Sequence, residues 1–249
     1  MLPFIFLVVG VLAQQTFAEE PEKIVGGQDA APGEFPHQGS LRLRGSHICG
    51  CSIIGPKTIL TAAHCVDGIA EYPYSNFKVV TGTIDRYTGG ETHDVKSVHV
   101  HPYYSDRVED AWVNDVAVIT LKSAIKYNQY QKPIALAKTR PADGTQCQLS
   151  GWGQISTNGP LPRILQKMFQ VIYNQEKCKQ RHNMPLTGSH VCAYNRYGIG
   201  ACSGDSGGPL ICGGVQCGIT SWVLPCAKGE PDAYTSVAYH YDFIEQYLE

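Results

Sequence analysis

Short runs of β-prone residues, separated by clusters of turn residues, make up most of the chain from Gln38 onward. Turn clusters such as Arg44-Gly45-Ser46 and Gly55-Pro56-Lys57 divide the first runs, as tight connections between strands require. The first group of predicted strands is Gln38–Leu43, His47–Ile54, Thr58–Thr61, Lys78–Gly82, Val95–His101 and Val116–Leu121. The second group is Cys147–Trp152, Lys167–Ile172, His190–Ala193, Pro209–Cys212, Gln216–Trp222 and Ala233–Val237. Two groups of about six strands predict an all-β protein of two antiparallel β-barrels.

The two ends of the chain follow different patterns. Ala238–Leu248 has apolar and aromatic residues at helical spacing, which predicts a C-terminal helix. Leu2–Leu12 is almost wholly apolar and precedes the small residues of Thr16-Phe17-Ala18, a pattern typical of a signal peptide cut after Ala18. The apolar run is shorter than the roughly 20 residues that a membrane span needs. We therefore expect residues 1–18 to be a signal peptide and the product to be secreted.

Composition and charge narrow the class of protein. The chain has 249 residues, and its formal net charge of -2 suggests neither a nucleic-acid partner nor a membrane-surface partner. Its 26 glycines suit a fold with many tight turns. Ten cysteines in one chain indicate an oxidising compartment. These numbers agree with an extracellular all-β protein.

The stretch Gly204-Asp205-Ser206-Gly207-Gly208-Pro209 carries the first candidate chemistry. Its glycines allow a tight turn that leaves space above the hydroxyl, and the N–H groups of Gly204 and Ser206 can then form an oxyanion hole. A hydroxyl needs a neighbouring base to be a good nucleophile. The chain offers His64 as the base and Asp115 as the carboxylate that orients it. We predict that these two residues lie on the first barrel, that the serine lies on the second, and that the active site is the crevice between them.

With these motifs in the order His, Asp, Ser, the chain resembles the chymotrypsin-like (S1) serine endopeptidases from Ile24 to the C-terminus. Its nearest likeness is to secreted arthropod chymotrypsin- and collagenase-like enzymes, on the residues Gly200-Ala201-Cys202 and Pro225–Asp232. The resemblance implies a trypsin-like fold, protein or peptide substrates, protein protease inhibitors as further partners, and no cofactor. The sequence is silent on oligomeric state, and a monomer is taken as the default. Thr83 stands where calcium-binding members have a glutamate, so no metal is expected.

The resemblance also implies that the protein is made as a zymogen. Residues 19–23 would form an activation propeptide, and a trypsin-like protease would cut after Lys23 to leave the peptidase domain 24–249. The new α-ammonium of Ile24 would then pair with Asp205, because a buried carboxylate needs a partner. That ammonium titrates near about 8 when free, and pairing raises its pKa. Activity is therefore expected to fall reversibly at strongly alkaline pH.

Eight of the ten cysteines match positions at which the family forms disulfides. The pairs that the resemblance implies are Cys49–Cys65, Cys147–Cys212, Cys178–Cys192 and Cys202–Cys226. Cys51 and Cys217 are left over. They form either a fifth bridge or, as we favour, two separate buried thiols that act as small core residues. A cysteine nucleophile or a zinc site is not expected, because neither residue has a histidine at ligand-like spacing.

The residues that resemble the family's substrate-binding site indicate different substrate specificities. The strand Ser221-Trp222-Val223 would pair with the substrate backbone by strand addition, with the Ser221 hydroxyl near Asp115. Gly200 stands at the base of the specificity pocket, where trypsins have an aspartate, whereas Asp232 occupies a pocket position usually held by glycine. The valine of the strand stands where most members have glycine, and it narrows the pocket mouth as in elastases.

Three specificities therefore stay open. The enzyme cleaves after apolar residues like chymotrypsins and elastases, or broadly like the collagenases, or after Lys and Arg with Asp232 as the pocket charge. We favour apolar cleavage. A further alternative is an inactive binding protein of the same fold, but such proteins usually lose a triad residue, and His64, Asp115 and Ser206 are all present.

Overall fold

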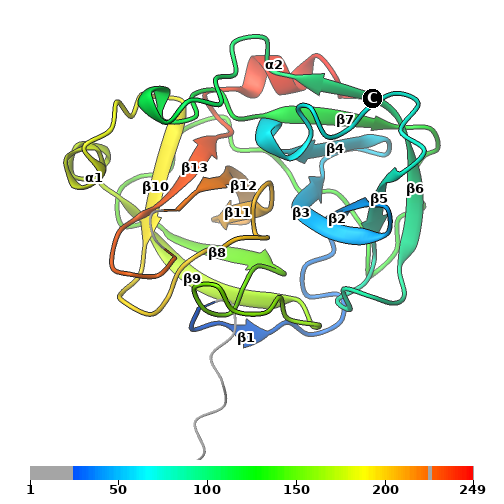
Figure 1. The fold of residues 1–249 in the computed structure, drawn as a ribbon, viewed down its shortest axis with the longest axis horizontal. Helices are drawn as coiled ribbons and strands as arrows, with labels where there is room; N and C mark the ends of the chain where they lie inside the picture. Colours follow the sequence, from blue (N-terminus) through cyan, green and yellow to red (C-terminus); the bar gives the residue numbers. More distant parts are fainter. Residues whose placement is uncertain (1–24, 224–225, 249) are drawn as a thin grey trace, which may run out of the picture.

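The computed structural model describes residues 25–223 and 226–248, and Figure 1 shows them as two β-barrels side by side. The expected signal peptide (1–18), the expected propeptide (19–23) and Ile24 lie outside the described residues. Within the described ranges no helix is long and apolar enough to cross a membrane.

Six antiparallel strands form the first barrel. They are β2 (Gln38–Leu43), β3 (Ser46–Ile53), β4 (Thr58–Thr61), β5 (Phe77–Thr81), β6 (Glu91–Val100) and β7 (Ala117–Leu121). They close in the order β2-β3-β4-β7-β6-β5. Leu41, Ile53, Ile59 and Val79 are among the fully buried side chains that fill the interior. Inward-facing side chains of a small barrel form its core. The β-branched residues and leucines of the first group of predicted strands supply this core.

Six further strands form the second barrel. They are β8 (Gln146–Gly151), β9 (Gln166–Tyr173), β10 (His190–Tyr194), β11 (Pro209–Cys212), β12 (Val215–Trp222) and β13 (Asp232–Ser236). The order β9-β10-β13-β12-β11-β8 is closed by pairing of β8 with β9, and the two-residue strand β1 (Gln28–Asp29) extends β9 at its other edge. The predicted all-β fold of two antiparallel barrels is confirmed.

The helices are short. The predicted C-terminal helix is present as α2 (Tyr241–Glu245), which is shorter than the expected Ala238–Leu248 and buries Ile244 against the first barrel. Helix α1 (Gln175–His182) was not predicted, because it buries only Cys178 and therefore lacks an apolar stripe. Asn174 caps it by accepting a hydrogen bond from the Lys177 amide at 3.1 Å. Two 3₁₀ helices, Ala63–Cys65 and Val108–Asp110, complete the regular structure of the described chain.

The two barrels meet where three chain segments of different origin come together. His64 lies on the 3₁₀ helix that follows β4, Asp115 precedes β7, and Ser206 precedes β11. The Gly50 amide on β3 donates to the Ser206 carbonyl at 2.7 Å. The Thr61 hydroxyl on β4 donates to the Gly50 carbonyl at 3.0 Å. The first bond holds the serine loop of the second barrel against β3, and the second braces that part of β3 against β4.

Candidate active site

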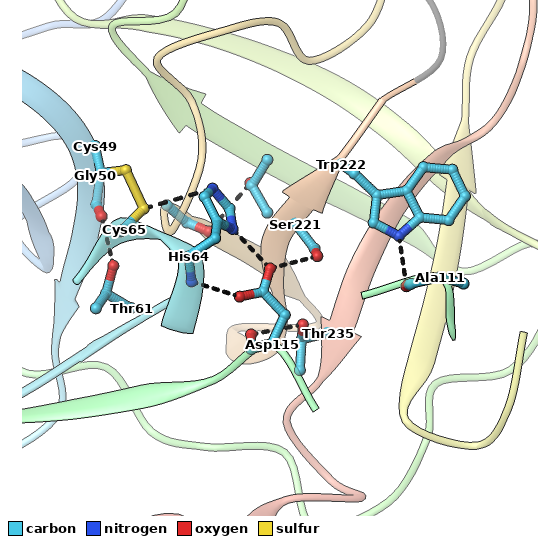
Figure 2. Close-up of polar contacts among 12 residues, drawn as sticks. Cys49, Gly50, Thr61, His64, Cys65, Ala111, Asp115, Ser221, Trp222 and Thr235 are labelled. Carbon is cyan, nitrogen blue, oxygen red and sulfur yellow. Dashed lines mark hydrogen bonds and ion pairs between the residues drawn. A yellow bond between two sulfur atoms is a disulfide. The ribbon is translucent and has the colours of Figure 1, made fainter. Parts of the chain in front are cut away.

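Asp115 is the centre of a hydrogen-bond network at the junction of the barrels (Figure 2). Its carboxylate is fully buried, and Oδ2 accepts from His64 Nδ1 at 2.7 Å and from the Ser221 hydroxyl at 2.6 Å. Oδ1 accepts from the His64 amide at 2.9 Å. The Thr235 hydroxyl donates to the backbone carbonyl of the aspartate at 2.8 Å. Donors from three elements therefore fix the position of this carboxylate, as Figure 2 shows.

This network sets the protonation of the His64 ring. A carboxylate only accepts hydrogen bonds, so Nδ1 carries the proton and Nε2 of the neutral ring is free to act as a base. Burial by itself lowers the pKa of His64, but the charge of Asp115 and its hydrogen bond outweigh burial and raise this pKa above its ordinary value. Nε2 lies 3.7 Å from the Cys65 sulfur. Within the described chain no hydrogen bond joins it to the Ser206 hydroxyl, a contact that commonly tightens only when substrate binds.

The loop that carries Ser206 depends on glycine. Gly204 has φ +101° and Gly207 has φ +75°, a region that strains any residue with a side chain. A Cβ atom at Gly207 would lie 2.2 Å from the Thr61 hydroxyl oxygen. Among the described residues no acceptor binds the N–H groups of Gly204 and Ser206. Two unpaired N–H groups next to a serine hydroxyl are what an oxyanion hole requires.

Asp205 is buried beside this loop without a cation among the described residues. Its Oδ1 accepts from the Gly153 amide at 2.7 Å and its Oδ2 from the Cys202 amide at 3.0 Å. Burial raises the pKa of this carboxyl to about 7. Nearby, the Val25 carbonyl accepts from the Gly200 amide at 3.2 Å. The described N-terminal segment therefore reaches the second barrel at Gly200, five residues before Asp205 in the sequence, while Ile24 itself lies outside the described residues.

The residues expected at the specificity pocket fall on two strands and one loop. Asp232 begins β13 and is buried, and its Oδ2 accepts from the Ala201 amide at 2.7 Å and from the Gln170 side chain at 2.5 Å. Burial raises the pKa of this carboxyl to about 7. A Cβ atom at Gly200 would lie 3.2 Å from the same oxygen. Gly200 is therefore packed closely against Asp232 and the Ala227 backbone, where a side chain would crowd both.

The strand expected to bind substrate is β12 and its end. Ser221 and Trp222 are buried on β12, and Val223 follows half-buried. The Trp222 indole N–H donates to the Ala111 carbonyl at 3.0 Å, which anchors this strand to the loop before Asp115 (Figure 2).

The contact of Asp232 with Gln170 was missed in the sequence. Gln170 alternates on β9 in phase with Met168 and Ile172, and all three side chains point to the buried face of the strand. A polar residue at a core-facing position needs a buried hydrogen-bond partner. In the predicted strand Lys167–Ile172, Gln170 alternates with the apolar residues that face the core, and this alternation could have indicated a buried polar contact.

The expected disulfides Cys49–Cys65, Cys178–Cys192 and Cys202–Cys226 are present in the structure. Cys51 is buried as a free thiol and does not pair with Cys217. The Cys212 sulfur lies at disulfide distance from both Cys147 and Cys217, and only one of these two bridges can form. If the expected Cys147–Cys212 bridge forms, Cys217 is the separate buried thiol, and if Cys212 pairs with Cys217, Cys147 is the thiol. The turn at Gly213-Gly214 folds the β11–β12 hairpin so that the Cα atoms of Cys212 and Cys217 are 5.8 Å apart.

Two groups of side chains in the described residues have three potential metal-binding atoms close together. One is Cys49, His64 and Cys65, and the other is Cys147, Cys212 and Cys217. Metal ions bind cysteine as the thiolate, and both sulfurs of the first group are joined in a disulfide. In the second group Cys212 shares its sulfur with a disulfide partner, so at most one thiol is left.

Comparison with known proteins agrees with the fold. The sequence profile of the Trypsin family matches residues 24–244. Chymotrypsin-2 of Vespa crabro is 38% identical over 224 residues, which cover 90% of this chain and 99% of that protein. Trypsin beta of Drosophila erecta is 36% identical over 250 residues and 96% of each chain. The solved structure of neuropsin, a serine protease expressed in the limbic system of mouse brain, is 31% identical and superposes with a TM-score of 0.81 over 88% of this chain and 97% of that chain.

The fold and the relatives together define a serine-type endopeptidase. The chain belongs to the trypsin family.

Proposed function

We propose that Ser206, His64 and Asp115 are the catalytic triad of this endopeptidase. The observation that carries the proposal is the buried Asp115 carboxylate, which accepts from His64 Nδ1 at 2.7 Å and so leaves Nε2 as the base. Ser221 also donates to this carboxylate and helps to hold it in place. An oriented histidine next to a serine loop with free N–H groups is the arrangement that acyl transfer needs.

In the proposed reaction the Ser206 hydroxyl attacks the scissile carbonyl carbon, and its proton passes to His64 Nε2. The N–H groups of Gly204 and Ser206 stabilise the oxyanion, an interaction whose loss typically costs about 3–4 kcal/mol per donor. The imidazolium then protonates the leaving amine as the C–N bond breaks. Water, deprotonated by the same histidine, hydrolyses the acyl-enzyme and restores the serine.

The protein is further proposed to be a secreted zymogen. Residues 1–18 would be removed on secretion, and a trypsin-like protease would cut after Lys23 to remove residues 19–23. The freed Ile24 ammonium would pair with Asp205, whose buried carboxylate has no cationic partner among the described residues. Protein substrates and protein protease inhibitors would then bind the mature enzyme.

The proposed P1 preference is for apolar side chains. Three features support it: Gly200 supplies no charge at the pocket base, Val223 adds apolar volume at the mouth, and Asp232 is already hydrogen-bonded by Ala201 and Gln170. Two other specificities compete with it. Broad collagenase-like cleavage would need a wider pocket mouth, and cleavage after Lys or Arg would need an Asp232 charge that is free to pair with the substrate.

The test is a cleavage profile of the activated enzyme. The precursor is cut with trypsin, the trypsin is removed, Ile24 is verified as the new N-terminus, and a diverse peptide library is digested, with Ser206→Ala as the inactive control. We expect cleavage mainly after apolar residues and labelling of Ser206 by a serine-directed phosphonate. Cleavage mainly after Lys or Arg would overturn the P1 preference. No cleavage and no labelling, with Ile24 exposed, would identify an inactive binding protein instead.

A further inference from the structure

Gln170 is an unusual residue for its position in the second barrel. It lies on the inward face of β9, between Met168 and Ile172, and its side chain is 2% exposed. An amide that leaves water for an apolar interior costs free energy unless its donors and acceptors find partners. The partners of Gln170 therefore indicate why a polar side chain is tolerated at this place.

The amide joins two other buried residues in one directed chain of hydrogen bonds. The Tyr234 hydroxyl donates to Gln170 Oε1, and Gln170 Nε2 donates to Asp232 Oδ2, each at 2.5 Å. When the Asp232 carboxyl is ionised it can only accept, so the NH₂ side of the amide must face it and Oε1 is left to accept from Tyr234. Each bond polarises the next, so the tyrosine hydroxyl makes Nε2 a better donor to the carboxylate.

This chain of hydrogen bonds takes the place of a counter-ion for Asp232. Its Oδ2 receives two donors, Gln170 Nε2 and the Ala201 amide at 2.7 Å, and no cationic side chain of the described residues pairs with it. The same oxygen is the atom that faces Gly200, at 3.2 Å from where a Cβ would stand. The oxygen closest to the pocket base is thus the one that the protein's own donors occupy.

We propose that Gln170, held by Tyr234, is a specificity-determining positioning residue that engages Asp232 and keeps the pocket selective for uncharged P1 side chains. The inference rests on the proposed P1 preference and names the residues that produce it. The two donors already on Oδ2 offset the charge of Asp232, so a lysine or arginine side chain gains less from pairing with it than from an unpartnered carboxylate. Removing that donor leaves a buried carboxylate short of partners and also raises its pKa further. Wherever the carboxylate is ionised it then favours an incoming cation, so the ratios are measured at a pH above this raised pKa.

The experiment compares activated wild-type enzyme with Gln170→Met, which keeps the length of the side chain and removes the donor. Two probes of nearly the same shape are used as competitive inhibitors, the cation benzamidine and the neutral benzamide, together with substrates that carry Lys or Phe at P1. We expect the inhibition constants and the kcat/KM values both to shift in favour of the cationic member by about tenfold, the size of one charge-assisted hydrogen bond.

Controls separate positioning from general damage to the barrel. Ile172→Met changes the next inward residue of β9 and should leave both ratios unchanged. Gln170→Met combined with Asp232→Asn should lose the shift, because the carboxylate that attracts the cation is gone. Tyr234→Phe, which removes only the donor to the amide, should shift the ratios in the same direction by a smaller factor, and it decides the matter if Gln170→Met does not fold.

The outcomes for this inference and for the proposed function are separate. An unchanged ratio in folded, active Gln170→Met, or a shift that persists without the Asp232 carboxylate, would overturn the role of Gln170. A wild-type enzyme that already prefers Lys or Arg would instead overturn the proposed P1 preference, whatever the variants do.

Discussion

At the scale of single residues, the Asp115 carboxylate decides which tautomer of His64 is present. Asp115→Asn is expected to lower kcat/KM by about 10⁴-fold, because the amide NH₂ group can face Nδ1 and stabilise the tautomer whose Nε2 carries the proton. The measurement is kcat/KM of the activated enzyme. Thr235→Val is the matched control, since it removes only the bond to the Asp115 backbone carbonyl. Equal losses in both variants would contradict a specific role of the carboxylate.

The pH profile tests the same contact in a second way. With His64 as the proposed general base, activity needs its neutral form, so kcat/KM should fall as the pH drops through the pKa of His64, which the Asp115 charge raises above its ordinary value. Ser221 donates to the same Oδ2. Without this donor the carboxylate attracts the imidazolium more strongly, so Ser221→Ala should move the acid limb to higher pH, whereas Asp115→Asn should move it lower. A downward shift in Ser221→Ala would show that its hydroxyl does not compete with His64 for the carboxylate.

At the scale of elements, packing against strand β3 fixes the position of the serine loop. A Cβ atom at Gly50 would lie 2.8 Å from the Gly208 Cα, and the Gly50 amide donates to the Ser206 carbonyl. Gly50→Ala must therefore push the loop away from β3. We expect kcat/KM to fall by about 10²-fold, because an error of 1 Å in position has an effect of that size.

The control for this variant is Gly188→Ala, whose new Cβ would meet only the exposed ring of Tyr239 at 3.2 Å. It should leave kcat/KM and Tm nearly unchanged. Both quantities are measured for both variants. Full activity of Gly50→Ala would mean that the serine loop adjusts without moving the nucleophile.

The elements also separate what the sequence could predict from what it could not. Strands such as Thr58–Thr61 and Pro209–Cys212 were predicted with their observed bounds, because buried β-prone runs end at turn residues. Helix α1 has no apolar stripe, and β1 has only two residues, so neither leaves a periodic signal. The fold and the candidate triad follow from local patterns and motifs. The partners of Asp232 do not, because Gln170 meets it across the barrel from a strand 62 residues away.

At the scale of the whole molecule, the ten cysteines predict a definite number of thiols. Cys51 is a free buried thiol, and a sulfur forms only one disulfide, so Cys147, Cys212 and Cys217 can supply one disulfide and one thiol. Unfolded, unreduced protein should therefore contain two thiols and four disulfides, by thiol titration and by peptide mapping. Cys147→Ser and Cys217→Ser should each contain one thiol, because Cys212 still has a partner in both. Protein without any thiol would contradict this count.

If the protein is the proposed zymogen, Asp205 should connect cleavage at the N-terminus with the stability of the whole precursor. Burial raises its folded-state pKa from 3.8 to about 7, so between these values the folded chain holds a proton that the unfolded chain has lost. The contribution of this group to stability is therefore complete below about pH 4 and is lost as the pH rises to 7, by up to about 1.4 kcal/mol per pH unit. Asp232 also makes the free energy of unfolding fall as the pH rises, but it does so equally in the precursor and in the cleaved form.

The difference between the two forms isolates Asp205. After cleavage the Ile24 ammonium should pair with the Asp205 carboxylate and keep it ionised. The free energy of unfolding of the cleaved form should therefore lack the pH dependence that Asp205 gives the precursor. Pairing also raises the pKa of the ammonium above about 8, and its contribution is lost only when the pH rises through that higher value. We expect urea unfolding of Ser206→Ala protein to show that the cleaved form gains stability relative to the precursor as the pH rises from 4 to 7. Parallel curves would mean that Asp205 does not sense the new N-terminus, and the proposed activation mechanism would fail with it.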